Sequence, residues 1–533
     1  MNSQTHNKFN RFFYTLLLMI SSVITLGTIT FAEDGTFTVG MEAGYPPFNW
    51  TQKDDSNGAV PIKGSKEFAG GYDVEIAKRI ADGLGKELVI FKTEWDGLPP
   101  AVTSGKADAI IAGMSPTEER KQTLDFSDYY YSSQLTILVK KDSPYANATS
   151  LKDFEGAKIT GQLNTLHYGV IDQIPGVAKQ TPMTDFSAMR VSLDSGKVDG
   201  YVTEIPEGIT AEKLNPNFKM IQFKDGKGFQ TSEADNAIAI GMKKGSPQVS
   251  EVNQILANIS QEERDQIMDD AISQQPEVVN NKPWYVWVKD IATENWQMFL
   301  RGAGVTLLIA LVGTVVGTTI GLGIGIYRTI PTPEKAFLRF MYKLINTLFS
   351  IYIEIFRGTP MIVQSMVIFY GSKQLYGIDM NPITAALFIV SINTGAYMTE
   401  IVRGGIFAVD KGQFEAASAI GMTHWQTMKN VVIPQVFRNT LPAIGNEFVI
   451  NIKDTSVLNV IAVSELFFAT KTVAGANFRF FETFMITCVI YFVMTFTVTR
   501  ILRYLEKRLD GDGTYAPYAN QMQTSKLERK DER

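Results

Sequence analysis

A hydroxyl-rich turn followed by an arginine stands within residues 110–130, which read IIAGMSPTEERKQTLDFSDYY. An apolar strand is expected to end at Gly113, and hydroxyl side chains follow at Ser115 and Thr117. Arg120 lies three residues beyond Thr117, so one helical turn directs its guanidinium and the helix N-terminal amides into the same space. This pattern suits a carboxylate, which arginine binds with two hydrogen bonds, although alone it also fits a helix cap with a surface arginine.

The two halves of the chain differ in polarity. The overall values, 45% hydrophobic and 20% charged residues, hide this difference because they average over 533 residues. Charged and turn residues are frequent from residue 34 to residue 290. Residues 299–505 instead contain long uncharged stretches such as GVTLLIALVGTVVGTTIGLGIGIY, which are long enough to span a bilayer. We therefore expect a soluble domain joined to a membrane domain.

Several functional classes are disfavoured by composition. A net charge of -5 provides no basic surface for nucleic acid. The single cysteine, Cys488, excludes an intrachain disulfide, and three scattered histidines without a Cys/His cluster disfavour a metal site. No G-x-x-x-x-G-K-[ST] motif occurs, so the chain has no phosphate loop for ATP. We expect no cofactor and no enzymatic activity in this chain itself.

The N-terminus has the layout of a secretory signal. Lys8 and Arg11 precede the apolar run FFYTLLLMISSVITLGTITFA, and Glu33 follows it. Residues 1–32 are therefore predicted to be a signal peptide, and an uncleaved signal anchor also fits the length of the run. Both alternatives place the following domain, residues 34–275, outside the cytoplasm.

Strand and helix patterns alternate through residues 34–275. TFTVGM and ELVIFKT are typical of buried strands, and between them lies the helical pattern YDVEIAKRIADGLG with Asp73 at the expected N-cap. ADAIIAG follows as another strand. AKITGQ, VDGYVTE and NAIAIGM predict a second α/β unit, and YYYSSQLTILVKK is expected to cross between the two. The fold class is therefore a two-lobed α/β domain with mostly parallel sheets and a cleft between the lobes.

An all-α transmembrane domain is expected at residues 298–508, after a tryptophan-rich linker at 276–297. Lys and Arg cluster in the loops after the first, third and last apolar runs, which places these loops and the C-terminus in the cytoplasm. An external N-terminal domain then requires an odd number of spans. Residues 509–533 have little apolar content and are expected to be a disordered cytoplasmic tail. Five apolar runs are found, at about 299–327, 345–372, 383–402, 441–463 and 482–500.

The N-terminal half resembles the polar amino acid-binding proteins of ATP-binding cassette (ABC) importers, which have the type II periplasmic-binding-protein fold. The stretches that carry the resemblance are VGMEAGYPPFNW, GGYDVEIAKRIA, WDGLPPAVTSGKADAIIAGMSPTEERKQTLDFSDYYY and GYVTEIPEG. The resemblance implies that Arg120, Ser115 and Thr165 hold the ligand carboxylate, and that Glu204 and Gly113 hold its amino group. Asn164 precedes Thr165 where the family has Gly, and Asn tolerates positive φ better than most residues.

The same resemblance implies which residues meet the ligand side chain. Tyr45 and Trp95 occupy the two stacking positions, and Glu42 and Asp73 stand where an acid would meet the far end of the ligand. Two aromatic faces and one or two carboxylates suit a cationic amino acid, namely arginine, lysine or histidine. Glutamine and glutamate remain open, as does the simpler interpretation that Tyr45 and Trp95 are core aromatics and Asp73 a helix cap.

A polar segment, EAASAIGMTHWQTMKNVVIPQ, interrupts the apolar half at residues 415–435. Two short helical patterns flank Gly421, and alone they would also suit a helix lying on the membrane surface. The segment resembles the EAA loop of importer permeases, and IEIFRGTPMIVQ and NIKDTSVLNVIAVSEL resemble their polar amino acid branch. The resemblance implies that Glu415, Ala416, Ala417 and Gly421 dock on a separate cytosolic ABC ATPase.

These features predict a fused substrate-binding and permease subunit of an amino acid ABC importer in the plasma membrane. It is expected to act as a homodimer with cytosolic ATPase subunits. Ionisable residues are expensive within spans, and Glu400 and Glu447 are expected to face the translocation route. Two other classes are a ligand-gated channel, which needs a pore loop, and a sensor or cell-wall enzyme, which needs a catalytic domain.

Overall fold

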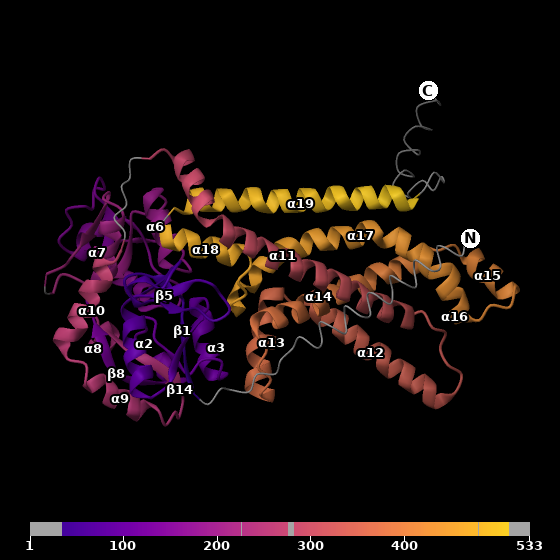
Figure 1. Ribbon diagram of the computed structural model, residues 1–533, viewed down its shortest axis with the longest axis horizontal. Coiled ribbons are helices and arrows are strands. Elements are labelled where there is room, and N and C mark those ends of the chain that lie inside the picture. The colour runs from indigo at the N-terminus through magenta and orange to yellow at the C-terminus, as the bar shows by residue number, and fades with distance from the viewer. Residues whose placement is uncertain (1–34, 225, 276–281, 478, 511–533) are drawn as a thin grey trace.

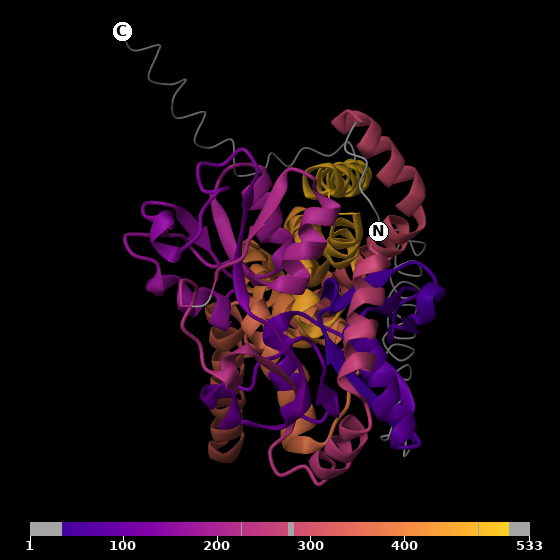
Figure 2. The same ribbon diagram turned by 90° about the vertical axis from the view of Figure 1, so that its left-hand side faces the viewer.

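The computed structural model describes residues 35–224, 226–275, 282–477 and 479–510. The predicted signal segment and nearly all of the predicted tail lie outside these residues. The chain forms an N-terminal domain, residues 35–275, which contains the three sheets, and a helical domain, residues 284–510. The N-terminal domain lies at one end of the long helices (Figure 1). Figure 2 shows it in front of them when the molecule is seen end-on.

Lobe 1, defined here as residues 35–132 and 237–275, is built on a five-stranded sheet in the order β6-β1-β7-β14-β8. The segments TFTVGM and ELVIFKT form β1 and β6, which pair in parallel as the alternation of strand and helix predicted. The strands are β1 (Thr36–Met41), β6 (Glu87–Lys92), β7 (Ala109–Ile110), β8 (Leu124–Ser132) and β14 (Ala237–Lys243). β14 runs antiparallel to both of its neighbours, so this sheet is mixed.

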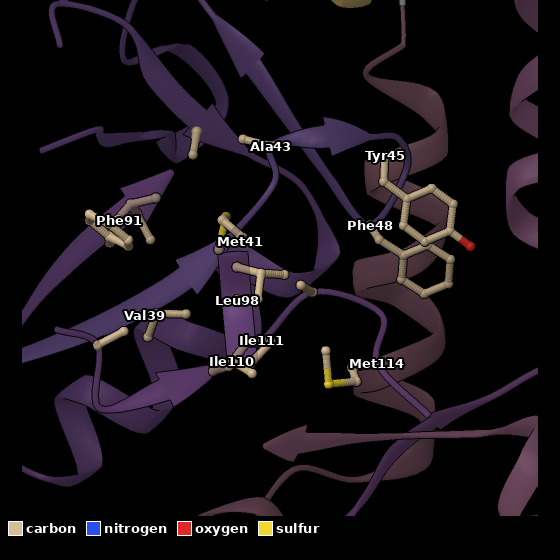
Figure 3. Close-up of a cluster of buried hydrophobic side chains, with 14 of the residues drawn as sticks. Val39, Met41, Ala43, Tyr45, Phe48, Phe91, Leu98, Ile110, Ile111 and Met114 are labelled. Carbon is tan, nitrogen blue, oxygen red and sulfur yellow. The ribbon is translucent and has the colours of Figure 1, made fainter. Parts of the chain in front are cut away.

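The centre of lobe 1 is apolar because alternate residues of these strands are long aliphatic or aromatic side chains. Val39, Met41 and Ile110 are fully buried and pack with Leu98 (Figure 3). This core fixes the ends of β1 and β7, and the segments that follow those two strands carry several of the predicted ligand residues.

The first helix of lobe 1 differs from the prediction at its start. α2 (Tyr72–Gly83) has its N-cap at Gly71, with a φ of 124°, and Asp73 lies inside the first turn. Only glycine fits at position 71, since a Cβ there would overlap the main chain of Phe48. The predicted N-cap at Asp73 is therefore wrong, and its side chain is free for the contacts described below.

Lobe 2, defined as residues 135–236, is built on a sheet in the order β11-β10-β12-β9-β13. Its strands are β9 (Leu135–Lys140), β10 (Lys158–Thr160), β11 (Ala178–Lys179), β12 (Gly200–Glu204) and β13 (Phe218–Ile221). The chain crosses between the lobes after β8, as predicted. The segment NAIAIGM, however, forms β14 of lobe 1 rather than a strand of lobe 2, because the chain returns to pair with β7 and β8.

Smaller elements complete the N-terminal domain. A second sheet of lobe 1 contains β2 (Gly44–Tyr45), β3 (Asn49–Gln52), β4 (Val60–Pro61) and β5 (Phe68–Gly70). The remaining helices are α3 (Leu98–Thr103), α4 (Glu118–Lys121), α5 (Leu166–Gly169), α6 (Phe186–Asp194), α7 (Ile205–Leu214), α8 (Glu233–Asn236), α9 (Val249–Ala257) and α10 (Gln261–Ser273).

The helical domain begins inside the predicted linker, since its first helix already starts at Trp284 and continues unbroken to Tyr327. Its helices are α11 (Trp284–Tyr327), α12 (Ala336–Gly358), α13 (Met361–Tyr376), α14 (Pro382–Phe407), α15 (Lys411–Ala419), α16 (His424–Thr427), α17 (Ile433–Asp454), α18 (Leu466–Asn477) and α19 (Phe480–Asp510). A π-helical turn, Met428–Val432, joins α16 to α17, and the 3-10 segment η6 (Thr455–Ile461) follows α17.

Within the residues that the structure describes, three helices, α11, α14 and α19, are long and apolar enough to cross a membrane. A fourth candidate span is the bent pair 424–461 and 466–477, which turns by 58° at its break. This number is roughly consistent with the predicted five. The predicted run at 345–372 is divided between α12 and α13, which meet at Thr359 and Pro360.

Four glycines of α11 let it approach α14 closely. Gly313, Gly317, Gly321 and Gly325 are spaced four residues apart, and each faces one residue of a matching row on α14. A Cβ on Gly317 would lie 2.6 Å from the Cβ of Thr394. Small residues at this spacing allow close backbone contact between membrane helices, so van der Waals packing holds the pair together.

Gly317→Ala should therefore lower the stability of the full chain, by about 1 to 3 kcal/mol, because the added methyl forces α11 and α14 apart. Gly323→Ala is the matched control, since its Cβ has no atom within 4 Å. That substitution should be neutral or slightly stabilising. Thermal unfolding of the detergent-solubilised protein measures both, and equal effects would contradict this account of the helix pair.

Candidate functional site

A cavity of about 20 Å³ lies between the two lobes. It has space for about one water molecule, so the N-terminal domain is in a closed form that must open to admit a larger ligand. Seven of the nine predicted ligand residues line it: Glu42, Tyr45, Trp95, Gly113, Ser115, Arg120 and Thr165. The other lining residues are Gln162, Leu166, His167 and Phe186, all from lobe 2.

Arg120 spans the cavity from lobe 1 to lobe 2. Its Nη1 donates to the main-chain oxygen of Ser115 and its Nη2 to that of Asn164, both at 2.9 Å. The guanidinium also lies over the ring of Trp95, 5.2 Å from its centroid. Burial lowers the pKa of Arg120 to about 10, and it stays charged near neutral pH. A half-buried cation with only main-chain acceptors is a site that a carboxylate can enter.

The loop that meets Arg120 in lobe 2 has the shape that its sequence suggested. Asn164 adopts a φ of 57°, in the left-handed region that Asn tolerates. Its side chain donates to Asp96 of lobe 1 at 2.9 Å, so the loop also bridges the lobes. The hydroxyl of Thr165 donates to the main-chain oxygen of Gln162 at 2.7 Å, which turns the loop toward the cavity.

Glu204 stands behind the cavity lining at the end of β12. It is buried, and its carboxylate accepts a hydrogen bond from the Tyr45 hydroxyl and lies 2.8 Å from Nε2 of His167. Burial acts to raise the pKa of Glu204, but His167 and the hydrogen bond from Tyr45 outweigh it and hold that pKa below its usual value. Glu204 is therefore an anion satisfied by protein groups from both lobes.

Glu42 follows β1 and lies at the other side of the cavity. Burial raises the pKa of Glu42 to about 8, and the nearby carboxylates of Asp185 and Glu94 add to this shift. Nε2 of Gln162 lies 3.4 Å from its carboxyl group, across the cleft. Glu42 is thus protonated near neutral pH in this closed form, and a cation entering the cavity would favour its ionised form.

Among the four residues predicted to meet the ligand side chain, Asp73 is the one that does not line the cavity. It is fully buried, and its carboxylate accepts hydrogen bonds from Tyr130 at 2.7 Å and from Asn49 at 2.8 Å. The hydroxyl of Tyr130 in turn accepts the main-chain N–H of Gly113 at 3.2 Å. Asp73 therefore orients the Gly113 turn from behind. Burial raises the pKa of Asp73 to about 6.

The aromatic faces at the cavity are covered by protein groups in this form. The ring of Tyr45 stacks between Phe48 and Phe186, at centroid distances of 4.9 and 4.4 Å. Figure 3 shows the rings of Tyr45 and Phe48 side by side. Phe186 belongs to lobe 2, so this stack also crosses the cleft. Opening the lobes would expose a face of Tyr45 to a ligand.

A buried charge network fixes the lobe 2 wall. Arg190 of α6 donates to Glu207 of α7, with Nε at 2.9 Å, and the hydroxyls of Thr203 and Tyr201 donate to the same carboxylate at 2.6 and 3.0 Å. These bonds tie α6 and α7 to β12. They therefore hold Phe186, at the start of α6, and Glu204, at the end of β12, in place.

Four lining residues were not anticipated as cavity residues: Gln162, Leu166, His167 and Phe186. Gln162 and His167 flank the predicted Thr165 within one short loop, so the loop itself was a signal for them. Phe186 is the first residue of α6, in a separate segment that follows β11, and its sequence surroundings give no indication of the cavity. In the part of the chain that the structure describes, no group of three or more His, Cys, Asp or Glu could hold a metal ion.

The predicted ATPase-docking segment lies at the end of the helical domain farthest from the N-terminal domain (Figure 1). Glu415 and Ala416 of α15 are exposed, whereas Ala417 is buried against the helices. Gly421 is exposed and has a φ of 78°, so it provides the turn between α15 and α16. The apolar side chains of Ile420 and Trp425 beside it are 76% and 62% exposed.

The two glutamates assigned to a translocation route have different surroundings. Glu400 of α14 pairs with Arg403 at 2.6 Å and with Arg328, the C-cap residue of α11, at 3.3 Å. Its charge is therefore neutralised within the protein. Glu447 is buried in α17, one turn before Asn451, whose amide donates to Thr314 and Thr394. Buried polar groups thus line the contact among α11, α14 and α17.

Two protein families match this chain. Residues 37–273 match the bacterial extracellular solute-binding proteins, family 3, and residues 336–511 match the inner membrane components of binding-protein-dependent transport systems. The glutamine transport system permease protein GlnP of Escherichia coli strain K12 is 36% identical over 213 residues, which cover 40% of this chain and 93% of GlnP. The arginine transport system permease protein ArtQ of Bacillus subtilis strain 168 is 32% identical over 210 residues, 39% of this chain and 91% of ArtQ.

Solved structures similar to the chain are amino acid-binding proteins. The substrate-binding protein AbpA of Streptococcus pneumoniae bound to L-arginine shares 25% identity, with a TM-score of 0.39, over 45% of this chain and 95% of that one. An ancestral arginine-binding protein bound to glutamine shares 32% identity, with a TM-score of 0.38, over 45% of this chain and 98% of that one.

Proposed function

The chain belongs to the permease family of amino acid ABC transporters and carries a family 3 solute-binding domain in the same polypeptide, and from that premise we propose that it imports polar amino acids, with a preference for cationic ones. The observation that carries the proposal is the cavity between the lobes, which is lined by one arginine and one acid, both half-buried. A free amino acid with a cationic side chain has a carboxylate and a distant positive charge that match these two groups.

The ligand carboxylate is proposed to bind Arg120, with Ser115 and Thr165 beside it. In the closed form the guanidinium donates to two main-chain oxygens, and the carboxylate would replace these with charge-assisted bonds, which are stronger. Ser115 and Thr165 both line the same cavity. Their hydroxyls can each donate one further hydrogen bond to a carboxylate oxygen.

The ligand amino group is proposed to bind Glu204 and the main-chain oxygen of Gly113. Glu204 already meets a positively polarised group, since His167 Nε2 lies 2.8 Å from it. An ammonium would take that place or share the carboxylate. The buried hydrogen bonds from Asp73 through Tyr130 to Gly113 hold the turn of lobe 1 that completes this position.

The ligand side chain is proposed to lie between Tyr45 and Trp95, with its far end at Glu42. A guanidinium or ammonium is attracted to both aromatic faces, and it favours the ionised form of the acid. Asp73, which is buried away from the cavity, is proposed to act only through Gly113. Glutamine is the second candidate, because Gln162 already places an amide 3.4 Å from Glu42 and the neutral acid suits such a group.

The segment 415–435 is proposed to dock on a separate cytosolic ABC ATPase, in a homodimer of this chain. Its position at the far end of the helices from the cavity supports this assignment, because the energy source and the ligand site then lie at opposite ends (Figure 1). The exposed Ile420 and Trp425 give it an apolar contact surface. The N-terminal domain would then lie outside the cytoplasm, and α15, α16 and the C-terminus inside.

Substitutions of Arg120 and Glu42 should have different effects: the first on the affinity for every amino acid, the second on the preference for arginine over glutamine. Arg120→Ala removes the carboxylate site, so it should weaken both arginine and glutamine on the order of a hundredfold. Glu42→Gln should weaken arginine more than about tenfold and change glutamine less than about threefold. Calorimetric titration of the full chain measures these values, with the partly exposed Arg79→Ala, outside the cavity lining, as control. Equal effects of the two substitutions on both ligands would contradict the division of roles.

The affinity for arginine should rise with pH toward about 8, whereas that for glutamine stays level. The raised pKa of Glu42 means that a bound cation must expel a proton at lower pH. This loss amounts to at most about tenfold in affinity per pH unit. Both ligands share the same carboxylate and amino group, so glutamine is the control for pH effects on the rest of the site. Tight glutamine binding without an arginine response would overturn the cationic preference.

Gly421→Ala should uncouple transport from ATP hydrolysis. A side chain at its positive φ costs about 1 to 2 kcal/mol of backbone strain, which distorts the turn between α15 and α16. We expect ligand-stimulated ATP hydrolysis by the assembled transporter to fall severalfold, while binding of the amino acid by the same variant is unchanged. Gly404→Ala, inside α14 with open space around its Cβ, is the control. A loss of ligand binding in Gly421→Ala would contradict the assignment.

A further inference from the structure

A lysine of the helical domain reaches between the two lobes of the N-terminal domain. Nζ of Lys471, on α18, lies 2.7 Å from Oε2 of Glu94 in lobe 1 and 3.2 Å from Oδ2 of Asp185 in lobe 2. All three side chains are largely buried, with exposed fractions of 23%, 24% and 15%. One ammonium group therefore holds a carboxylate from each lobe. Figure 1 shows α18 beside the N-terminal domain.

Both carboxylates stand next to walls of the ligand cavity. Glu94 directly precedes Trp95, and Asp185 directly precedes Phe186, and these two aromatic residues line opposite sides of the cleft. Asp185 is also the N-cap of α6, where it accepts the N–H of Ala188 at 2.8 Å. Each carboxylate is therefore fixed to its own lobe. The distance between them must follow the opening and closing of the cleft.

A single ammonium can pair with both carboxylates only when the cleft is closed. Two oxygen atoms bound to the same nitrogen cannot be farther apart than the sum of their distances to it. Opening the lobes moves Glu94 away from Asp185, so Lys471 must release one of them. The released carboxylate and the half-paired lysine lose a charge-assisted hydrogen bond that is partly shielded from water.

The helical domain holds Lys471 in a fixed position. Glu465, fully buried at the start of α18, accepts the N–H groups of Phe467 and Phe468 at 2.9 and 2.7 Å. The hydroxyl of Thr470 also pairs with that of Thr487 on α19 at 2.6 Å. Since α18 is fastened at both points, the ammonium is presented at one place to whichever form of the N-terminal domain approaches.

Two further ion pairs between the domains involve lobe 1 alone. Lys106 of lobe 1 pairs with Asp379 at 2.7 Å, and Glu67 pairs with Arg301 of α11 at 2.7 Å. Neither contact includes a residue of lobe 2, so both persist whether the cleft is open or closed. They attach the N-terminal domain to the helical domain without sensing its conformation.

We propose that Lys471 makes docking of the N-terminal domain depend on closure of its lobes, which extends the import function proposed above. The closed domain offers both carboxylates to Lys471 and docks more tightly than the open domain, which offers one. By linkage, docking on Lys471 stabilises the closed form by the same free energy. Lys471 is a positioning residue, because it acts through Glu94 and Asp185 and not on the ligand.

The test measures closure directly in the full chain and needs no ligand. Asp96→Cys and Asn164→Cys place thiols on opposite lobes, where the native side chains are 2.9 Å apart, in a Cys488→Ser background that removes the native thiol. The rate at which a short bifunctional thiol reagent joins the lobes then reports how often the cleft is closed. The protein is held in lipid nanodiscs so that docking is preserved.

Lys471→Met in this background should slow cross-linking about fivefold or more, because the closed form loses its bridge. Lys471→Arg keeps the charge and should restore at least part of the rate. Lys106→Met is the matched control, since it breaks an attachment of lobe 1 alone and should leave the rate unchanged. An unchanged rate in Lys471→Met, or an equal fall in Lys106→Met, would overturn the proposal.

Addition of L-arginine or L-glutamine separates this inference from the proposed function. The two-cysteine background and its Lys106→Met variant both keep Lys471. Both should cross-link faster when the preferred amino acid is present. If neither amino acid accelerates cross-linking while Lys471→Met still slows it, the assigned ligands are wrong and the role of Lys471 stands. If the amino acids accelerate it and Lys471→Met has no effect, the import function stands and the role of Lys471 is wrong.

Discussion

The guanidinium of Arg120 joins the two lobes of the closed cleft, because it bonds to lobe 1 through Ser115 and to lobe 2 through Asn164. A cation that is partly removed from water needs hydrogen-bond acceptors, and the acceptors of Arg120 come from both lobes. In the closed form these acceptors bind the N–H groups of the guanidinium. In an open form water would bind them instead. A ligand carboxylate offers a third arrangement, with stronger charge-assisted bonds than the main-chain oxygens provide.

The same exchange applies to the other groups at the cavity. Glu204 is satisfied by His167 and Tyr45, and the ring of Tyr45 is covered by Phe186, so protein groups occupy the positions proposed for the ligand. Because the cleft can close without a ligand, ligand binding gains only the difference in free energy between the ligand's contacts and the protein contacts that they replace. The free energy that distinguishes a loaded from an empty domain is then modest, and a contact that favours the closed form strengthens the response of the helical domain to it.

Local sequence patterns predicted the elements that carry the site but not all of its contacts. β1, β6 and α2 follow from apolar periodicity, and the positive φ of Asn164 follows from its residue type. The placement of NAIAIGM in lobe 2 was wrong, because periodicity shows that a strand is buried without showing which sheet it joins.

Long-range contacts were beyond such patterns for a related reason. Asp73 was assigned to the ligand side chain, and its buried position behind Gly113 depends on Tyr130, from a strand distant in the sequence. Lys471 carries no local signal, since an ordinary lysine in a short apolar helix becomes informative only when its partners come from another domain. A resemblance to a family transfers positions around a ligand more readily than contacts between domains.

One continuous path joins the proposed ATPase-docking segment to the cleft. The helix that begins at His424, beside Gly421, continues through α17 and η6 to Ile461, and α18 follows after a bend of 58°. Asn459, in η6 at the far end of this path, donates to Glu94 at 3.3 Å, the same carboxylate that Lys471 binds. A movement of the docking segment would shift a helix whose other end contacts lobe 1. Because Lys471 on α18 binds both Glu94 and Asp185, whereas Asn459 in η6 binds Glu94 alone, a change in the angle between η6 and α18 would draw Glu94 away from Lys471 and so favour opening of the cleft over the helical domain.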